Sequence, residues 1–280
     1  MADADLVSVH GGHSGEFCHH AQDTLEEIVR AYIDKGFAWF GITEHMPPAD
    51  DSQIYPEEAA AGLDVAALYE RFSNYIATCR RLQEQYADAI KVYVGFETEM
   101  YTGCKEYIDR LLQEFEPDYI VGSVHHVNDI PIDMSAEMYA KAIEVAGGIE
   151  RLYCDYFDQQ FELIDTFHPA VVGHFDLIRM FDEDYRRRLE EPEIRQRIQR
   201  NFARIKELGL ILDFNLRALK KGADEPYISR SILVEAYELG LAVVPGDDSH
   251  GVDGVGLFME QGLEVLRQVG FDLRWRRPGD

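Results

Sequence analysis

Histidine and carboxylate side chains follow the short apolar runs of this 280-residue chain, at the points where predicted β-strands end. Imidazole and carboxylate groups together form the ligand set for zinc, manganese or iron. The candidate ligands are His10, His13, His45, Glu97, His125, His174, Asp248 and His250, and His20 follows shortly after the first pair. If the fold gathers the strand ends, these side chains build one centre for several ions. The pattern is typical of a metal-dependent hydrolase.

Each candidate also has a simpler interpretation when it is taken alone. His10 and His13 flank two glycines, as two exposed histidines on a glycine-rich turn would. A lone histidine such as His45 is more often structural, and a lone Glu97 is more often a surface charge. The adjacent histidines at 125–126 are more unusual after an apolar run. The recurrence of these residues at successive strand ends is what favours a metal centre.

The elements that would position these residues alternate between strands and helices. Strands are predicted over 6–9, 38–43, 90–96, 118–124, 170–173, 210–214 and 241–244. Helices are predicted over about 64–85, 106–115, 135–165, 193–208, 229–239 and 256–269, with a break at 147–148. Another helix is expected after Asp23 as its N-cap, with Glu26 in the capping-box position. Seven strand–helix units predict an α/β fold, a closed or nearly closed parallel barrel of the TIM-barrel type in one domain.

The composition argues against a nucleic-acid-binding protein, a membrane protein and a disulfide-bonded scaffold. The 52 acidic side chains against 27 basic ones give a net charge of −25, which repels nucleic acids and anionic membranes. The four cysteines are far apart and form no C-x-x-C pair, as expected for a reduced, cytoplasmic protein. No apolar segment is long enough for a signal peptide or a membrane span. We therefore expect a soluble enzyme that acts on a small molecule.

The motifs at the strand ends resemble those of the polymerase-and-histidinol-phosphatase (PHP) superfamily, and within it the histidinol-phosphate phosphatase branch. They are HGGHSGEFCHHA at 10–21, TEH at 43–45, GFE at 95–97, SVHH at 123–126, GHFDLI at 173–178 and GDDSHG at 246–251. The opening motif and GHFDLI are the ones that point to the branch. The resemblance implies a distorted (β/α)7 barrel, with one domain over 1–280, residues 270–280 as a tail, and two or three divalent ions (Zn, Mn or Fe).

The resemblance also implies a distribution of the ligands. The first ion would be held by His10, His13, Glu97 and Asp248, the second by Glu97, His125 and His174, and the third by His20, His45 and His250. The family usually has H-x-H at the first strand, whereas this chain has one additional glycine between His10 and His13. The extra residue could bulge out and leave both histidines as ligands, or it could displace His10.

Such a centre would hydrolyse a phosphomonoester by attack of a hydroxide held between two cations. Arg179 and Arg217 are candidates to grip the phosphate oxygens, because a guanidinium can bind two of them in fixed geometry. His126 is a further candidate substrate contact. Asp248 or Asp176 could protonate the departing alkoxide, and Asp176 could also orient the neighbouring imidazole of the GHFDLI motif.

The specific prediction is hydrolysis of L-histidinol phosphate. Its amino group would need a carboxylate and its imidazole an aromatic neighbour, for which Glu44, Asp155, Tyr153 and Tyr156 are candidates. The alternatives are a phosphatase for another small ester, such as a nucleotide or sugar phosphate, an amidohydrolase-type metal hydrolase, and a non-catalytic module. Amidohydrolases typically use a metal-bridging lysine, and no lysine stands at a predicted strand end.

Overall fold

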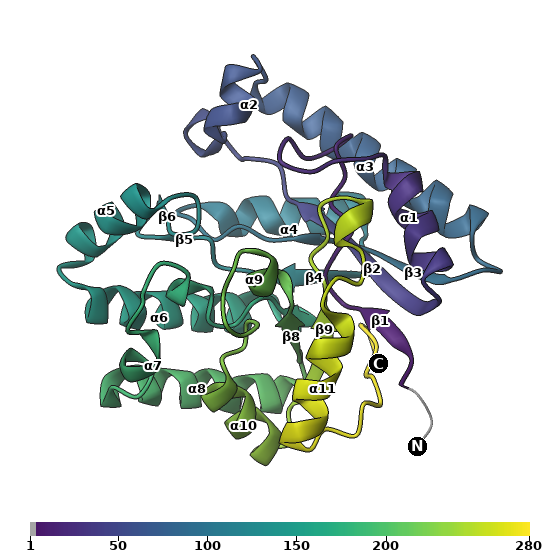
Figure 1. Cartoon of the computed structure of the whole chain (residues 1–280). Helices are drawn as coiled ribbons and strands as arrows, with labels where there is room; N and C mark the ends of the chain where they lie inside the picture. Colours follow the sequence, from purple (N-terminus) through teal and green to yellow (C-terminus); the bar gives the residue numbers. More distant parts are fainter. Residues whose placement is uncertain (1–3) are drawn as a thin grey trace.

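Seven parallel strands form a nearly closed barrel in the computed structural model, which describes residues 4–280 (Figure 1). In chain order and in spatial order they are β1 (Leu6–Ser8), β2 (Phe37–His45), β3 (Lys91–Glu97), β4 (Tyr119–Gly122), β7 (Val171–Val172), β8 (Ile211–Asn215) and β9 (Ala242–Gly246). The first and last strands meet where Val9 N donates to Pro245 O at 2.9 Å. The predicted distorted (β/α)7 barrel is confirmed.

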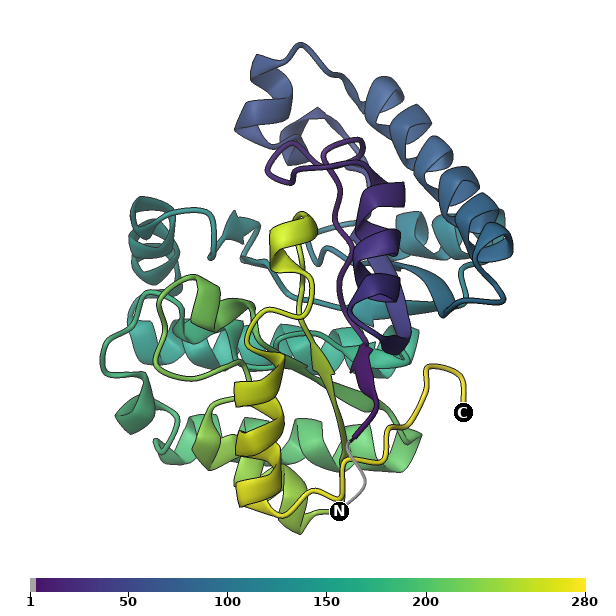
Figure 2. The same cartoon turned by 45° about the vertical axis from the view of Figure 1, so that its right-hand side comes forward.

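Helices surround the barrel on its outer side (Figures 1 and 2). They are α1 (Leu25–Asp34), α2 (Pro56–Ala60), α3 (Val65–Gln85), α4 (Cys104–Phe115), α5 (Ala136–Ala146), α6 (Ile149–Phe167), α7 (Tyr185–Arg188), α8 (Pro192–Leu208), α9 (Arg217–Lys220), α10 (Arg230–Glu238) and α11 (Met259–Val269), with single 3-10 turns η1 (Asp51–Gln53), η2 (Leu177–Arg179) and η3 (Val252–Gly254). A small antiparallel hairpin, β5 (His126–Val127) and β6 (Ile130–Pro131), stands apart from the barrel. Among the described residues, every helix is too short or too polar to span a bilayer.

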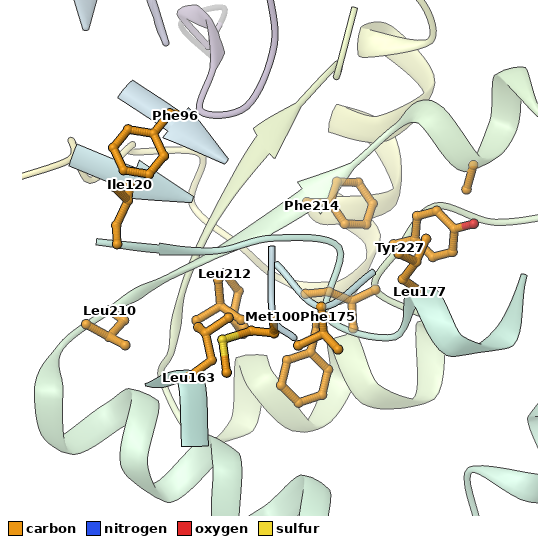
Figure 3. Close-up of a cluster of buried hydrophobic side chains, with 14 of the residues drawn as sticks. Phe96, Met100, Ile120, Leu163, Phe175, Leu177, Leu210, Leu212, Phe214 and Tyr227 are labelled. Atoms are coloured by element: carbon orange, nitrogen blue, oxygen red, sulfur yellow. The ribbon is translucent and has the colours of Figure 1, made fainter. Parts of the chain in front are cut away.

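Two apolar clusters stabilise this arrangement. The larger one lies between the strands and the helices, and Figure 3 shows part of it around Phe96, Phe175 and Phe214. The smaller one occupies the barrel interior near the strand beginnings and consists of Val7, Val9, Trp39, Tyr119, Val121, Val171, Ile211 and Val244. Because side chains alternate along a strand, the same inward face continues toward the carboxyl ends with polar residues. In β8, for example, inward Ile211 is followed by Asp213 and Asn215.

Small residues make room for large ones inside the barrel. Tyr119 reaches across the interior and donates from its hydroxyl to Val9 O at 2.7 Å. A side chain at Gly41 would overlap the Tyr119 hydroxyl, and a Cβ at Gly95 would lie 2.7 Å from the Tyr119 backbone oxygen and 3.1 Å from its ring. The two glycines are therefore required by the close approach of the Tyr119 side chain and backbone.

The start of α1 differs from the prediction by one residue. Thr24, not Asp23, is the N-cap, and its side chain accepts from Glu27 N while the Glu27 carboxylate accepts from Thr24 N at 2.8 Å. The prediction of Asp23 and Glu26 as the capping pair was wrong. Asp23 instead has φ of 64° and accepts from Val252 N through Oδ2 at 2.8 Å. The hairpin and the four- and five-residue helices were not predicted, because such short elements show no periodicity.

Candidate metal centre

Histidines and carboxylates from six strand ends meet at the carboxyl end of the barrel. They are His10 and His13 after β1, His45 at the end of β2, Glu97 at the end of β3, His125 after β4, His174 after β7, and Asp248 and His250 after β9. All of these except His45 and His250 are buried. The parallel barrel explains the convergence, because it points every strand end to one face.

The distances between donor atoms in this cluster fit bound cations. Glu97 Oε2 lies 3.3 Å from His10 Nε2, Glu97 Oε1 lies 3.3 Å from His125 Nε2, and Asp248 Oδ1 lies 3.4 Å from His13 Nε2. Ligands held at about 2.1 Å from one tetrahedral ion are themselves about 3.4 Å apart. The two oxygens of Glu97 face different histidines, which is the arrangement of a carboxylate that bridges two ions.

Several nitrogens of the cluster need a partner that the protein does not supply. Within residues 4–280, the buried atoms His10 Nε2, His13 Nε2 and His45 Nδ1 have no hydrogen-bond partner. An unsatisfied buried polar atom costs about 1–3 kcal/mol, so a group of them together is stable only with a ligand. The residues present therefore fit a site for divalent cations.

Two buried carboxylates behind the cluster fix the orientation of its first histidines. His10 Nδ1 lies 2.9 Å from Asp213 Oδ2, and His13 Nδ1 lies 2.8 Å from Glu44 Oε1. A carboxylate on the far nitrogen turns the near nitrogen toward a metal and raises its basicity. Asp213 was not predicted from the sequence, although a charged residue inside an apolar strand indicates a functional or supporting role. Glu44, predicted as a substrate contact, instead supports a histidine.

The additional glycine after β1 is absorbed by a tight bulge. Gly12 has φ of 81°, and Gly11 donates from its N to Thr43 Oγ1 at 3.1 Å while accepting from Thr43 N at 2.9 Å. A Cβ at Gly11 would lie 2.5 Å from both Asp247 Oδ1 and the hydroxyl of Tyr32. The structure thus places both flanking histidines in the cluster, and the first of them is not displaced.

The residues predicted for a third ion lie on the solvent side of the cluster. The side chain of His20 is 44% exposed, with ring centroids 5.0 Å from His250 and 5.7 Å from His45. Burial and the charge of His45 lower the pKa of His20 to about 4, which keeps this imidazole neutral and able to bind a metal. Cys18 Sγ lies 3.2 Å from His20 Nε2.

The carboxylates of the centre create a negative electrostatic potential at His45 and His125 in the absence of ions. Burial lowers the pKa of His45, but the hydrogen bond to Glu99 and the charge of Glu97 outweigh it and raise that pKa to about 9. Burial likewise opposes protonation of His125, and the charges of Glu99 and Glu97 raise its pKa well above the usual value. A negative potential that favours protons on imidazole also favours divalent cations.

Two predicted residues do not face the cavity. Asp176 is fully buried, where Oδ2 accepts from Ser229 N at 2.9 Å and from Arg179 Nε at 3.2 Å. The guanidinium of Arg179 donates to the carbonyls of Glu225 and Pro226 at 2.9 and 2.7 Å. Neither side chain lines the cavity above the cluster, so this geometry does not support the predictions of Arg179 as a phosphate ligand and of Asp176 as a proton donor or an orienting carboxylate. The pair joins η2 to the segment before α10.

An open cavity of about 450 Å³ lies above the cluster. Its lining consists of His20, His45, Glu97, His125, Asp133, His174, Leu177, Arg217, Lys221, Tyr227, Asp248 and His250. Arg217 and Lys221 are its cationic side chains among the described residues, and Arg217 donates from one Nη to Asp248 O at 3.3 Å. The predicted substrate contact His126 faces an adjoining cavity instead, with Nδ1 at 3.3 Å from Glu99 Oε2.

Comparisons with known proteins identify relatives along nearly the whole chain. Residues 11–217 match the PHP domain. A protein of Schizosaccharomyces pombe named "Probable histidinol-phosphatase" is 39% identical over 268 residues, which are 94% of this chain and 87% of that protein. The histidinol-phosphatase of Saccharomyces cerevisiae is 31% identical over 295 residues, covering 93% of this chain and 88% of that protein.

Solved structures share the fold. A candidate histidinol phosphatase from Listeria monocytogenes has a TM-score of 0.80 at 26% identity, covering 91% of this chain and 99% of that chain. The histidinol phosphate phosphatase of Lactococcus lactis, solved with zinc, L-histidinol and phosphate, has a TM-score of 0.72 at 19% identity, covering 95% and 94%. The PHP match includes neither His10 nor Asp248 and His250, so their place in the centre rests on the geometry above.

Proposed function

The chain belongs to the PHP domain family and to its histidinol-phosphatase branch, and on that premise we propose that it hydrolyses L-histidinol phosphate to L-histidinol and phosphate. The observation that carries the proposal is one small cavity in which a cation-binding cluster adjoins Arg217 and Lys221. The cluster suits divalent ions, and the two cationic side chains suit a phosphate. The identity of the alcohol part of the ester, L-histidinol, is inferred from the names of the relatives that match over more than 90% of the chain.

Two or three divalent ions would be held by the side chains that converge at the strand ends. We assign His10, His13, Glu97 and Asp248 to one ion, Glu97, His125 and His174 to a second, and His20, His45 and His250 to a third, on the contacts within each set. When bound, such ions make water a stronger acid and neutralise the charge of a phosphate ester. The zinc in the Lactococcus lactis structure supports zinc as one suitable metal.

The chain's own residues would bind the ester and transfer a proton from the attacking water to the leaving group. Arg217 and Lys221 would hold non-bridging phosphate oxygens, so that the leaving oxygen points away from the attacking water. The new bond forms between water oxygen and phosphorus, and the bond from phosphorus to the alcohol oxygen breaks. Of the two carboxylates considered for the proton, Asp248 lines the cavity. Burial opposes its ionisation, but nearby positive charges outweigh burial and lower its pKa, so Asp248 is ionised. We assign it the transfer of the proton lost by the attacking water to the departing alkoxide.

Phosphate release from L-histidinol phosphate tests this function directly. Protein reconstituted separately with manganese, zinc and iron is assayed beside a panel of nucleotide phosphates, sugar phosphates and p-nitrophenyl phosphate. We expect a marked preference for histidinol phosphate and its loss in Glu97→Ala, because Glu97 contacts histidines on both sides of the centre. Preferential turnover of another ester would overturn the substrate, and hydrolysis of amides alone would overturn the phosphatase assignment.

A further inference from the structure

The cavity above the metal centre contains a carboxylate that the centre does not use. Three acidic side chains line this cavity: Glu97, Asp133 and Asp248. Glu97 and Asp248 contact histidines of the cluster. Asp133 lies outside the cluster, and within residues 4–280 its carboxylate has neither a hydrogen-bond donor nor a cationic partner in contact. A half-buried anion that faces a cavity without a partner is suited to a cationic ligand.

The segment that carries Asp133 is anchored on both sides. It connects the β5–β6 hairpin to α5, next to the mouth of the barrel (Figure 1). On one side, buried Ile132 donates from its N to His125 O at 2.8 Å. On the other, Ser135 caps α5 by accepting from Met138 N at 3.1 Å. The two anchors hold the carboxylate at a fixed place beside the metal centre.

The residues that line the cavity together with Asp133 differ in charge and polarity. Asp133 and Tyr227 line the same cavity, and the charges of Asp176 and Asp133 add to the burial that raises the pKa of the Tyr227 phenol. Tyr227 and Leu177 supply apolar surface in the same cavity. The cations Arg217 and Lys221 come from another segment and are not paired with Asp133. The lining therefore offers cations, an anion and apolar surface to one ligand.

We propose that Asp133 is a specificity residue that binds the ammonium group of the substrate. The inference rests on the proposed function, because L-histidinol phosphate carries an ammonium group beside its phosphate. Other predicted partners of this group are occupied elsewhere. Glu44 holds His13, and Asp155 pairs with Arg151 at 2.8 Å in a separate groove. Asp133 is the acidic residue of the cavity that remains for the amine.

The test compares two substrates that differ only in the amine. One is L-histidinol phosphate, and the other is 3-(imidazol-4-yl)propyl phosphate, which lacks the amino group. We measure the ratio of their kcat/KM values in the unmodified holoenzyme and in Asp133→Asn. A charge-assisted hydrogen bond discriminates about 10- to 100-fold, so the ratio should fall by that factor in the variant. Asp133→Glu, which keeps the charge, should retain most of the ratio.

A structural role for Asp133 would give a different result. Loss of the fold or of bound metal would lower kcat/KM for both substrates and leave their ratio unchanged, and an unchanged ratio overturns the proposal. Glu137→Gln is the matched control, because Glu137 is exposed four residues further along and lines no part of the cavity. The control should keep the ratio of the unmodified enzyme.

Calorimetry keeps the two proposals separable. The unmodified protein and Asp133→Asn are titrated with L-histidinol and with 3-(imidazol-4-yl)propan-1-ol. If the protein does not hydrolyse histidinol phosphate but prefers the amine-bearing alcohol through Asp133, only the proposed function fails. If the preference is absent or survives in Asp133→Asn, the ammonium site is overturned whatever the enzyme hydrolyses.

Discussion

Replacing Asp213 by Asn tests whether the carboxylates behind the histidines set the affinity of the centre for cations. Asp213 is fully buried in β8, and its Oδ2 lies 2.9 Å from His10 Nδ1 and accepts from Asn215 Nδ2 at 3.0 Å and from His174 N at 3.3 Å. The substitution keeps the shape of the side chain and removes its charge. Because His10 and His174 are assigned to different ions, the change should weaken more than one site.

The size of the effect follows from the contact with His10. A hydrogen bond to a charged group contributes about 1.5–3 kcal/mol. Loss of a carboxylate behind a metal-ligating histidine lowers metal affinity about 10- to 100-fold. The two ranges agree, because each factor of ten is about 1.4 kcal/mol. We expect the dissociation constant for zinc to rise about 10- to 100-fold in Asp213→Asn, and excess zinc to restore turnover.

The assay is competition for zinc against a chromophoric chelator, together with phosphate release at increasing zinc. Asp176→Asn is the matched control, because Asp176 is equally buried but bonded to Ser229 and Arg179, outside the cavity. This control should lower the free energy of unfolding and leave zinc affinity unchanged. Unchanged affinity in Asp213→Asn, or an equal loss in both variants, would refute the reasoning.

Three further predictions follow from the same geometry. Removing the ions with a chelator should abolish turnover and lower Tm by about 5–10 °C, as expected when a ligand present at a concentration of about 100 times its Kd is lost. Phosphate release and scanning calorimetry, each repeated after metal is restored, measure the two effects. Arg217→Ala should lower kcat/KM for histidinol phosphate about 100-fold without reducing metal content, whereas equal kinetics would remove Arg217 from the phosphate site. Gly41→Ala should reduce the free energy of unfolding by about 2–4 kcal/mol, since the new methyl group overlaps the Tyr119 hydroxyl and breaks its bond to Val9; an unchanged urea midpoint would contradict this packing.

The barrel and the convergence of strand-end residues could be predicted because both depend on a strong, local pattern. Six of the seven apolar runs are followed closely by a histidine or carboxylate, and a parallel barrel sends every such end to one face. Glu97 therefore reaches the centre whatever the following loop does. Asp213 was missed because it lies inside its strand, where only the alternation of β8 shows that it points inward.

Side chains on short turns could not be predicted in the same way. Arg179 and Asp176 follow a strand, but the 3-10 turn η2 directs them to Ser229 and to the carbonyls before α10. No periodicity sets that rotation, because the partners are distant in the sequence. Asp133 was overlooked for a similar reason, since it lies in an irregular connection whose position depends on the bond from Ile132 to His125.

The charges of the cavity suggest how a strongly acidic protein can select an anionic substrate. The net charge of −25 repels phosphate at long range, so attraction must come from groups close to the bound ester. Divalent ions at the cluster, with Arg217 and Lys221, would reverse the sign locally, while Asp133 stays negative. A ligand that carries only phosphate gains from the first set alone. One that also carries an ammonium group gains from both, which favours a zwitterionic ester over a sugar phosphate or a nucleotide of similar size.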